Sequence, residues 1–333
     1  MSKGPVVIEV TRGPLVESRH EGIAAVVRPD GSVIESWGDI DARVLPRSAN
    51  KPIQAMAFVE SGAIEKFGLG NEHVALACAS HSGETRHVDT VRAWLKTVGL
   101  SEDDLECGTH APRLQASIEG LARANLLPTP AFNNCSGKHS GFLSTAVVYG
   151  EPTRGYIKYD HPVQRRLRAL MTDLCGSNAD DFQYGTDGCG IPTLATPLRL
   201  LARAMASMAE PSRLSNKHAE AAARIRAAIN AEPFLVAGTG RFCTRINEAL
   251  TGVAQVKTGA EGVFCGMLPT LGLGVAIKMW DGAARAAEVA MASLLDHLGV
   301  LPAGQREEIV HPPVKNVVGL LVGEMRPAKS WLG

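Results

Sequence analysis

The sequence lacks the features that indicate large or extended binding partners. Its 333 residues carry 34 Lys and Arg against 34 Asp and Glu, and no basic block or arm interrupts that balance. Nucleic-acid binding and membrane-surface binding depend on clustered positive charge, so we expect neither. No run approaches the ~18 apolar residues of a membrane span. Internal repeats and low-complexity tracts are also missing. These absences favour a small-molecule substrate.

The sequence also has little that would indicate export. Residues 1–10 contain no long apolar segment and no cleavage site, which argues against a secretory signal. The seven cysteines are odd in number and scattered without a disulfide framework, a usage typical of a reducing compartment. We therefore expect a cytoplasmic protein.

The order of the expected elements indicates an α+β fold. Apolar runs near both ends predict strands, and segments of high helix propensity lie between them. We expect one sheet built from N- and C-terminal strands and flanked by helices, in a single domain over 1–333 whose region of about 84–250 is mostly helical. The expected strands are 5–10, 22–28, 31–37, 253–257, 262–268, 272–280 and 314–323. The expected helices are 53–66, 84–98, 113–125, 142–149, 160–175, 197–209, 212–231 and 283–298; the run 74–78 could be strand or helix.

Ser48 and Lys51 lie in the stretch Arg-Ser-Ala-Asn-Lys-Pro at 47–52. Residues three apart share a face of a helical turn, so the amine can reach the hydroxyl. Serine attacks only after a base takes its proton, and lysine is such a base only where its pKa is lowered. Pro52, which has no N–H, predicts a tight turn leading into a helix. The same spacing arises by chance in many proteins, so support must come from elsewhere.

Three further loop-like stretches concentrate reactive side chains. The first is Ala-Ser-His-Ser-Gly-Glu at 79–84, whose serines could equally cap the following helix. The second is Asn-Asn-Cys-Ser-Gly-Lys-His-Ser-Gly at 133–141. The third is Gly-Thr-Asp-Gly-Cys-Gly-Ile-Pro at 185–192. Glycines in the last two permit the close backbone approach that a ligand loop needs.

Two of these stretches contain potential zinc ligands. Cys135, His139, Asp187 and Cys189 combine two soft sulfurs with harder partners, although their spacing is not that of a zinc finger. On chemistry alone, His139 is a better ligand than a lysine. The alternative is that both cysteines are inert and buried. Burial in the core is what we expect of the other cysteines, which are Cys78, Cys107, Cys175, Cys243 and Cys265.

A Lys-Thr-Gly tripeptide at 257–259 follows an expected strand. Paired with an N-terminal Ser-x-x-Lys, this tripeptide is found in penicillin-recognising serine enzymes. In those enzymes the glycine admits substrate close to the strand and the lysine supplies positive charge. Either motif is weak alone, and the pair in this chain order is more specific.

Taken together, these stretches resemble the Rhizobial-type (class 3) L-asparaginases over nearly the whole chain. The matching motifs run from the hairpin beginning at Glu21 to the Lys-Thr-Gly-Ala-Glu-Gly stretch ending at Gly262. The resemblance implies a fold like that of serine β-lactamases and glutaminases. It also implies hydrolysis of L-asparagine to L-aspartate and ammonia, by a homodimer.

The same resemblance implies roles for individual residues. It implies two catalytic Ser–Lys pairs, Ser48 with Lys51 and Ser80 with Lys257. It implies a zinc ion held by Cys135, Lys138 and Cys189, with water completing the site. Contacts to the substrate are expected from Arg47, Asn134, His139 and Asp187.

Three alternatives remain open at this stage. A β-lactamase-like or peptidase-like serine acyl hydrolase would keep the fold and change the substrate. A zinc hydrolase would use metal-bound water, and Ser48 would then only begin a helix. A binding protein on the same scaffold would hold a metal or an amino acid without turnover. Which serine attacks is open as well.

Overall fold

The structure is a computed structural model that describes residues 4–178 and 182–332. The chain forms two compact units. The sheet unit comprises Met1–Ala49, Thr196–Glu210 and Ala249–Gly333, and the helical unit comprises Asn50–Ala195 and Pro211–Glu248. The expectation of a single domain stays a prediction.

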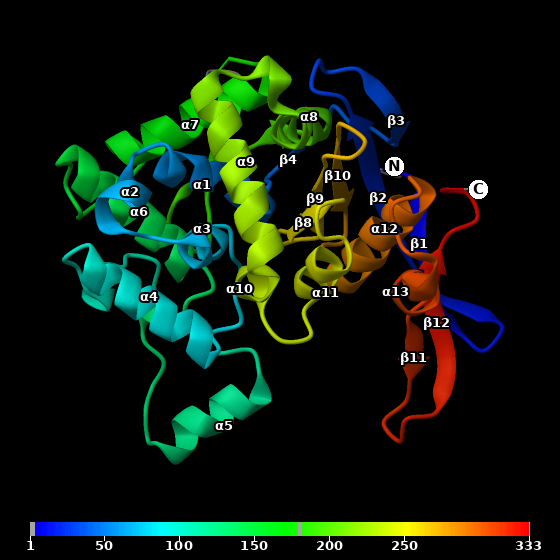
Figure 1. Ribbon diagram of the computed structural model, residues 1–333. Helices are drawn as coiled ribbons and strands as arrows, with labels where there is room; N and C mark the ends of the chain where they lie inside the picture. Colours follow the sequence, from blue (N-terminus) through cyan, green and yellow to red (C-terminus); the bar gives the residue numbers. More distant parts are fainter. Residues whose placement is uncertain (1–3, 179–181, 333) are drawn as a thin grey trace. The chain divides into compact units, whose positions relative to one another are not determined.

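The sheet unit is organised around an eight-stranded sheet whose neighbouring strands are antiparallel. The strand order is β11-β12-β1-β2-β10-β9-β8, with β3 paired to β2. N-terminal strands thus lie between C-terminal ones, so the expected sheet built from both termini is confirmed (Figure 1). The bounds are β1 Val6–Arg12, β2 Leu15–Val27, β3 Val33–Trp37, β8 Gln255–Thr258, β9 Val263–Leu268, β10 Leu273–Met279, β11 Pro313–Lys315 and β12 Leu321–Pro327.

Helices cover this sheet. Helix α8 (Leu198–Ala209) packs on β2, β9 and β10, and α12 (Ala284–His297) packs on β1, β9, β10 and β12. Every residue of β9 is buried, as expected for a strand covered on both faces. The sheet unit also contains α13 (Arg306–Val310) and a two-stranded ladder of β4 (Arg43–Val44) with β7 (Thr196–Pro197).

The expected last strand over 314–323 is wrong. The segment instead forms a hairpin of β11 and β12. The turn is closed by the Gly319 N–H, which donates to Asn316 O at 2.9 Å, and Gly319 has φ +84°. Because glycine has no Cβ, it adopts this angle at little cost, and the chain reverses within the apolar run.

The helical unit consists of helices packed on one another, with one short hairpin. Helix α1 packs on α6, α7 and α9, and α3 packs on α6 and α9. The bounds are α1 Lys51–Val59, α2 Ala63–Phe67, α3 Asn71–Ala77, α4 Thr85–Thr97, α5 Gln115–Arg123, α6 Ser136–Tyr149, α7 Pro162–Cys175, α9 Asn216–Ala231, α10 Pro233–Ala237, α11 Phe242–Ala249, β5 Tyr184–Thr186 and β6 Pro192–Leu194.

The first two helices of this unit differ from the sequence prediction, and the third was not predicted as a helix alone. The helix expected over 53–66 is interrupted, because Gly62 has φ +79° and separates α1 from α2. The apolar run 74–78, which the sequence predicts as strand or helix, belongs to helix α3 and its C-terminal cap. Its buried residues pack against α6 and α9, a tertiary contact that periodicity cannot reveal.

The helix starts expected at 160 and 212 also move. Helix α7 begins at Pro162, because the His161 side chain accepts the Val163 N–H at 3.2 Å and caps the helix. Helix α9 begins at Asn216, because the Ser215 hydroxyl accepts the His218 N–H at 3.3 Å. Local capping therefore decides both boundaries.

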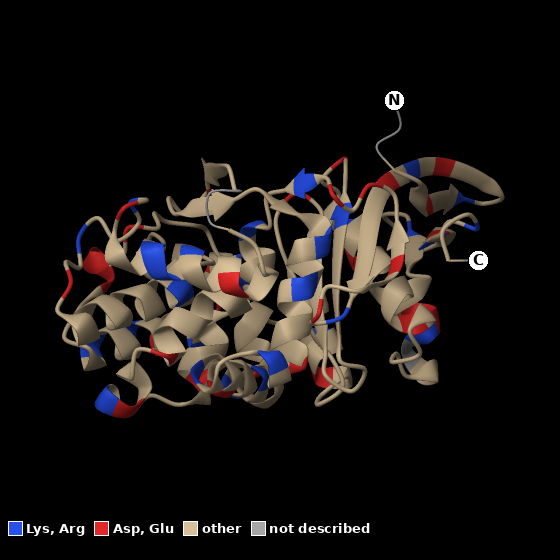
Figure 2. Ribbon diagram, turned by 90° about the horizontal axis from the view of Figure 1, so that it is seen from above, with Lys and Arg blue, Asp and Glu red and all other residues tan. Residues whose placement is uncertain are grey.

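Charged residues of both signs are interspersed along the ribbon (Figure 2). None of the helices in the described part of the chain is long and apolar enough to cross a membrane.

Candidate active site

Ser48 lies in a short 3-10 helix, Arg47–Asn50, that leads directly into α1 at Lys51. This is the tight entry turn that the sequence predicted. Arg47 has φ +50°, an angle that is uncommon for a residue with a Cβ and that often marks a functional turn. The Ala49 N–H donates to Pro46 O at 3.0 Å and closes the turn.

The Lys-Thr-Gly tripeptide lies against this same turn within the sheet unit. Strand β8 ends at Thr258, one residue beyond the expected end at Lys257. A Cβ added to Gly259 would lie 2.7 Å from Pro46 O and 3.1 Å from Ala49 N. Two motifs about 200 residues apart in the sequence therefore meet, and Gly259 is needed for their close packing. Lys257 is buried, and its ammonium donates to Thr258 O at 2.6 Å.

Lys51 is the best-defined candidate catalytic group in the helical unit. Its side chain is completely buried, at 0% exposed. The ammonium lies 3.1 Å from Ser80 Oγ and 3.4 Å from Asn134 O, and it also donates to Ala79 O. The structure thus brings Lys51 to Ser80 directly. The assigned pairs, Ser48 with Lys51 and Ser80 with Lys257, stay predictions.

The loop that carries Ser80 is held by the C-terminal end of α10. The Ser80 N–H donates to Val236 O at 2.9 Å, and the Ser82 hydroxyl donates to Ala237 O at 2.9 Å. The N-cap residue of α4 is Glu84, so neither serine caps that helix and the capping alternative is excluded.

Glu84, at the other end of the same loop, binds Thr239. Its carboxylate accepts the Thr239 N–H at 2.8 Å and the Thr239 hydroxyl at 2.6 Å. The contribution of 236–241 is not among the sequence predictions. The Gly-Thr-Gly run at 238–240 was the available signal, because it follows the pattern of the other glycine-rich stretches.

The stretch 133–141 is not a loop throughout, because α6 already begins at Ser136. Asn133 starts the helix: its Oδ1 accepts the Cys135 N–H at 2.8 Å, and its carbonyl accepts the Ser136 N–H at 2.9 Å. Lys138 and His139 therefore lie in the first turns of a helix and are buried. A helix holds these side chains more rigidly than a loop would.

Cys135, Lys138 and Cys189 form a buried cluster. The Lys138 ammonium lies 3.0 Å from Cys189 Sγ. A hydrogen bond from Cys135, together with the charge of Lys138, outweighs burial and lowers the pKa of Cys189 to about 5. The same hydrogen bond, together with burial, raises the pKa of Cys135 to about 12. Cys189 is thus a thiolate at neutral pH, held between a thiol and an ammonium.

Lys138 responds to the same partners. Burial lowers its pKa, but the charges of Cys189 and Cys135 outweigh burial, so the net shift is upward. Asp187 completes the surroundings, with Oδ2 3.9 Å from Cys189 Sγ. Asp187 and Cys189 lie in the turn between β5 and β6, where the Gly190 N–H donates to Asp187 O at 2.9 Å.

The cluster has the donor chemistry of a zinc site. Thiolates and nitrogen ligands suit zinc, and an amine can serve once it has lost its proton. Among the described residues, no three His, Cys, Asp or Glu side chains form a group that could hold a metal. A zinc ion bound here would therefore need the amine of Lys138 beside the two sulfurs.

His139 is buried next to this cluster and is held by a residue that the sequence did not indicate. Its Nδ1 lies 2.8 Å from Tyr156 Oη, and that oxygen accepts the Glu106 N–H at 2.8 Å. Tyr156 is outside every motif, and only the fold reveals its contact with His139.

Comparison with known families decides the identity of the chain. Residues 8–327 match the family model described as L-asparaginase II. The chain belongs to the L-asparaginase II family. The enzyme is therefore an L-asparaginase, a hydrolase of the asparagine side-chain amide, and the resemblance to asparaginases is confirmed. Among curated proteins, no sequence matches it.

Solved structures similar to this L-asparaginase have low sequence identity. A β-lactamase from Mycobacterium bovis is 14% identical, with a TM-score of 0.43 over 83% of this chain and 94% of that one. Mglu, crystallised in its tris and glutamate form, is 14% identical, with a TM-score of 0.48 over 90% of this chain and 64% of that one. An octameric penicillin-binding protein homologue from Pyrococcus abyssi is 15% identical, with a TM-score of 0.38 over 90% and 80%.

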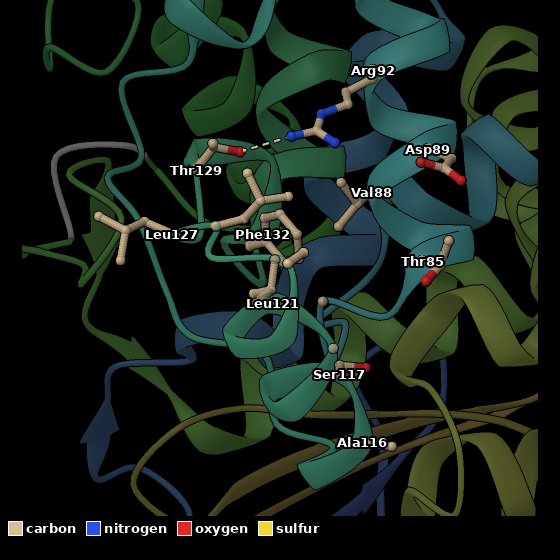
Figure 3. Close-up of a pocket in the computed structure, with 14 residues that line it drawn as sticks. Thr85, Val88, Asp89, Arg92, Ala116, Ser117, Leu121, Leu127, Thr129 and Phe132 are labelled. Carbon is tan, nitrogen blue, oxygen red and sulfur yellow. Dashed lines mark hydrogen bonds between the residues drawn. The ribbon is translucent and has the colours of Figure 1, made fainter.

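A cavity of about 520 Å³ lies between α4 and α5 of this L-asparaginase (Figure 3). Val88, Leu121 and Phe132 line it, and Arg92 donates to Thr129 Oγ1 at 3.3 Å at one side. The site residues predicted from the sequence do not line it. It nevertheless adjoins their loops, because its lining includes Gly83 as well as Phe132, which precedes Asn133 and Asn134.

Proposed function

We propose that this enzyme hydrolyses L-asparagine by serine nucleophilic catalysis with lysine as the proton carrier, at a site that contains zinc. The observation that carries the proposal is the contact of 3.1 Å between Lys51 Nζ and Ser80 Oγ. A buried lysine within hydrogen-bond reach of a serine is the arrangement that activates a hydroxyl in Ser–Lys enzymes. Ser48, in its strained turn, is the proposed nucleophile, and Ser80 is the alternative.

The reaction would proceed in two steps. The serine Oγ attacks the side-chain carboxamide carbon while its proton passes to Lys51, directly or through Ser80. Collapse of the tetrahedral intermediate breaks the C–N bond, and the lysine ammonium gives the leaving nitrogen its proton to form ammonia. Water then hydrolyses the β-aspartyl ester to L-aspartate and regenerates the serine.

Lys51 must change protonation state in this cycle. Three acceptors surround its ammonium, which suits the form that protonates the leaving group. In this cycle Lys51 would first accept the serine proton as a base. Its ammonium would then give a proton to the leaving nitrogen as an acid.

We propose that the amino-acid part of the substrate is held by Arg47, Asn134, His139 and Asp187. Zinc would be held by Cys135, Lys138 and Cys189 with a water molecule. When bound, it would supply positive charge that orients the substrate, because a sphere rich in thiolate reduces the ion's power to activate water.

We also propose a homodimer. Five apolar side chains at one edge of the sheet unit expose between 63% and 106% of their surface: Leu15, Val317, Val318, Leu320 and Leu321. The Gly13 N–H donates to Val322 O at 2.7 Å, which ties the turn near Leu15 to this hairpin. Soluble proteins seldom leave such a patch bare. A second copy of the chain would cover it. All seven cysteines are buried and none forms a disulfide, which supports the proposed cytoplasmic location.

The test is ammonia release from L-asparagine and L-glutamine by the purified enzyme and by its Ser48→Ala and Ser80→Ala variants. Release from asparagine that collapses in at least one variant supports the proposal. Activity within a few-fold of wild type in both variants would sink serine catalysis. Chelator sensitivity in both active variants would then favour zinc-bound water. Hydrolysis of a chromogenic cephalosporin instead of asparagine would favour a β-lactamase-like acyl hydrolase.

A further inference from the structure

The hydrogen bonds around Tyr156 determine the protonation of a buried histidine. Tyr156 Oη accepts the Glu106 N–H at 2.8 Å, and the tyrosine is completely buried. Its own proton then needs an acceptor, because a buried polar hydrogen left without a partner costs free energy. In the described part of the chain, the acceptor that it meets is His139 Nδ1, 2.8 Å away.

The reverse direction of this bond is unfavourable. If His139 Nδ1 carried a proton and donated it, Tyr156 Oη would accept twice and its own hydrogen would lack a partner. The same objection applies to the doubly protonated ring, which also donates from Nδ1. The arrangement that satisfies every group is a neutral His139 with its proton on Nε2.

The Nε2 atom of His139 is buried and has no hydrogen-bond partner within the described residues. With the tautomer argued above, this atom is a donor, not a lone pair. A metal ion needs the lone pair, so His139 in this state cannot ligate one. The sequence favoured His139 over Lys138 as a ligand, and Tyr156 supplies a physical reason for the opposite choice.

We propose that Tyr156 holds His139 as the Nε2–H tautomer and thereby makes His139 a hydrogen-bond donor to an oxygen of the bound amino acid, not a metal ligand. Tyr156 is a positioning residue, because it acts through His139. The donor part of the proposal rests on the proposed function. The tautomer part rests only on the hydrogen bonds around Tyr156.

The first test reads the tautomer in the metal-free wild-type enzyme. Long-range proton–nitrogen NMR distinguishes Nε2–H from Nδ1–H rings, and the His139→Gln variant identifies the signal by its loss. We expect the Nε2–H pattern, and a downfield shift of its proton when L-aspartate is added. An Nδ1–H pattern overturns the proposal whether or not the enzyme hydrolyses asparagine. An Nε2–H proton that ignores aspartate overturns its donor role.

The second test removes the tyrosine hydroxyl. In Tyr156→Phe we expect a mixture of both tautomers and a KM for asparagine raised about tenfold, the scale of one hydrogen bond, with a smaller change in kcat. Tyr159→Phe is the matched control, because Tyr159 stacks on Tyr184 instead. A pure Nε2–H ring in a folded Tyr156→Phe variant overturns the role of Tyr156.

The third test uses the visible spectrum of the cobalt-substituted enzyme, which reports on ligands independently of turnover. We expect His139→Gln to leave the ligand-field bands of wild type unchanged. Tyr156→Phe frees the Nε2 lone pair in part of the molecules, so a new nitrogen-ligand contribution is expected there. Loss of a nitrogen ligand in His139→Gln would overturn the proposal.

Discussion

Lys51 Nζ and Ser80 Oγ lie 3.1 Å apart, and both residues are buried. Lys51 begins α1 and Ser80 follows α3, with 28 residues between them. A lysine in this position has no role in solubility, and replacing it by an apolar side chain would avoid the cost of burying a charge. Its presence therefore favours a chemical role.

Removal of this amine should slow turnover strongly while the fold survives. We expect Lys51→Met to lower kcat for asparagine by a factor of about 10²–10⁴, the usual contribution of a positioned proton carrier. Ammonia release measures the rate. Lys66→Met is the control, because Lys66 lies on α2 and its ammonium is 5.4 Å from the Phe67 ring. Wild-type rates in a folded Lys51→Met enzyme would refute the proposed role.

Zinc binding should depend on the amine of Lys138. We expect Lys138→Met to weaken zinc binding about a hundredfold, measured by competition with a chromophoric chelator, because two sulfurs alone leave the coordination incomplete. Cys175→Ser is the matched control, since this buried cysteine ends α7, outside the cluster. Equal zinc affinity in Lys138→Met and wild type would contradict the proposed ligand set.

Two helical glycines should respond to substitution in opposite directions. A Cβ at Gly137 would overlap Leu76 O, a backbone atom that cannot move aside. A Cβ added to Gly120, which lies inside α5, would meet no neighbouring atom within 4 Å. Urea unfolding should show Gly137→Ala destabilised by about 1–3 kcal/mol and Gly120→Ala stabilised by up to about 1 kcal/mol. Similar stability changes in both would show that α3 and α6 are not in close contact.

The stability of the helical unit should fall in acid because of His87. Burial lowers the pKa of His87 to about 4 from an ordinary value of 6.5. Between these values the unfolded chain binds a proton that the native state does not. The contribution of His87 is therefore complete above about pH 6.5 and is lost as the pH falls to about 4, a change of about 3 kcal/mol.

Urea unfolding of wild type and His87→Gln at several pH values between 4 and 7 measures this effect. The slope of unfolding free energy against pH is proportional to the number of protons that the chain takes up on unfolding. We expect this number to be smaller by up to one in the variant. Parallel slopes would show that His87 titrates normally in the native state.

The exposed hairpin should control the oligomeric state. We expect Val318→Asp to convert a dimer into a monomer in light scattering, because it places charge in the proposed apolar interface. Leu127→Asp is the control, since Leu127 is at least as exposed as Val318 but lies in the helical unit. A wild-type monomer, or a Val318→Asp dimer of unchanged affinity, would rule out this surface.

Much of the fold and the candidate site followed from local signals in the sequence. The apolar runs near both ends and the segments of high helix propensity predicted most strands and helices. The Ser-x-x-Lys turn at 48–51 and the Lys-Thr-Gly end of β8 were also visible, because each depends on neighbours a few residues away. The remaining boundaries failed where a single side chain or angle decided them, as at His161 and Gly319.

The tertiary structure alone decided which reactive groups meet. Lys51 reaches Ser80, Glu84 holds Thr239, and Tyr156 bonds to His139. None of these contacts has a sequence signature, because hydrogen bonds between distant segments depend on how helices pack and not on spacing along the chain. Motifs could therefore identify the reactive residues, while packing determined their partners and, for His139, the nitrogen that carries the proton.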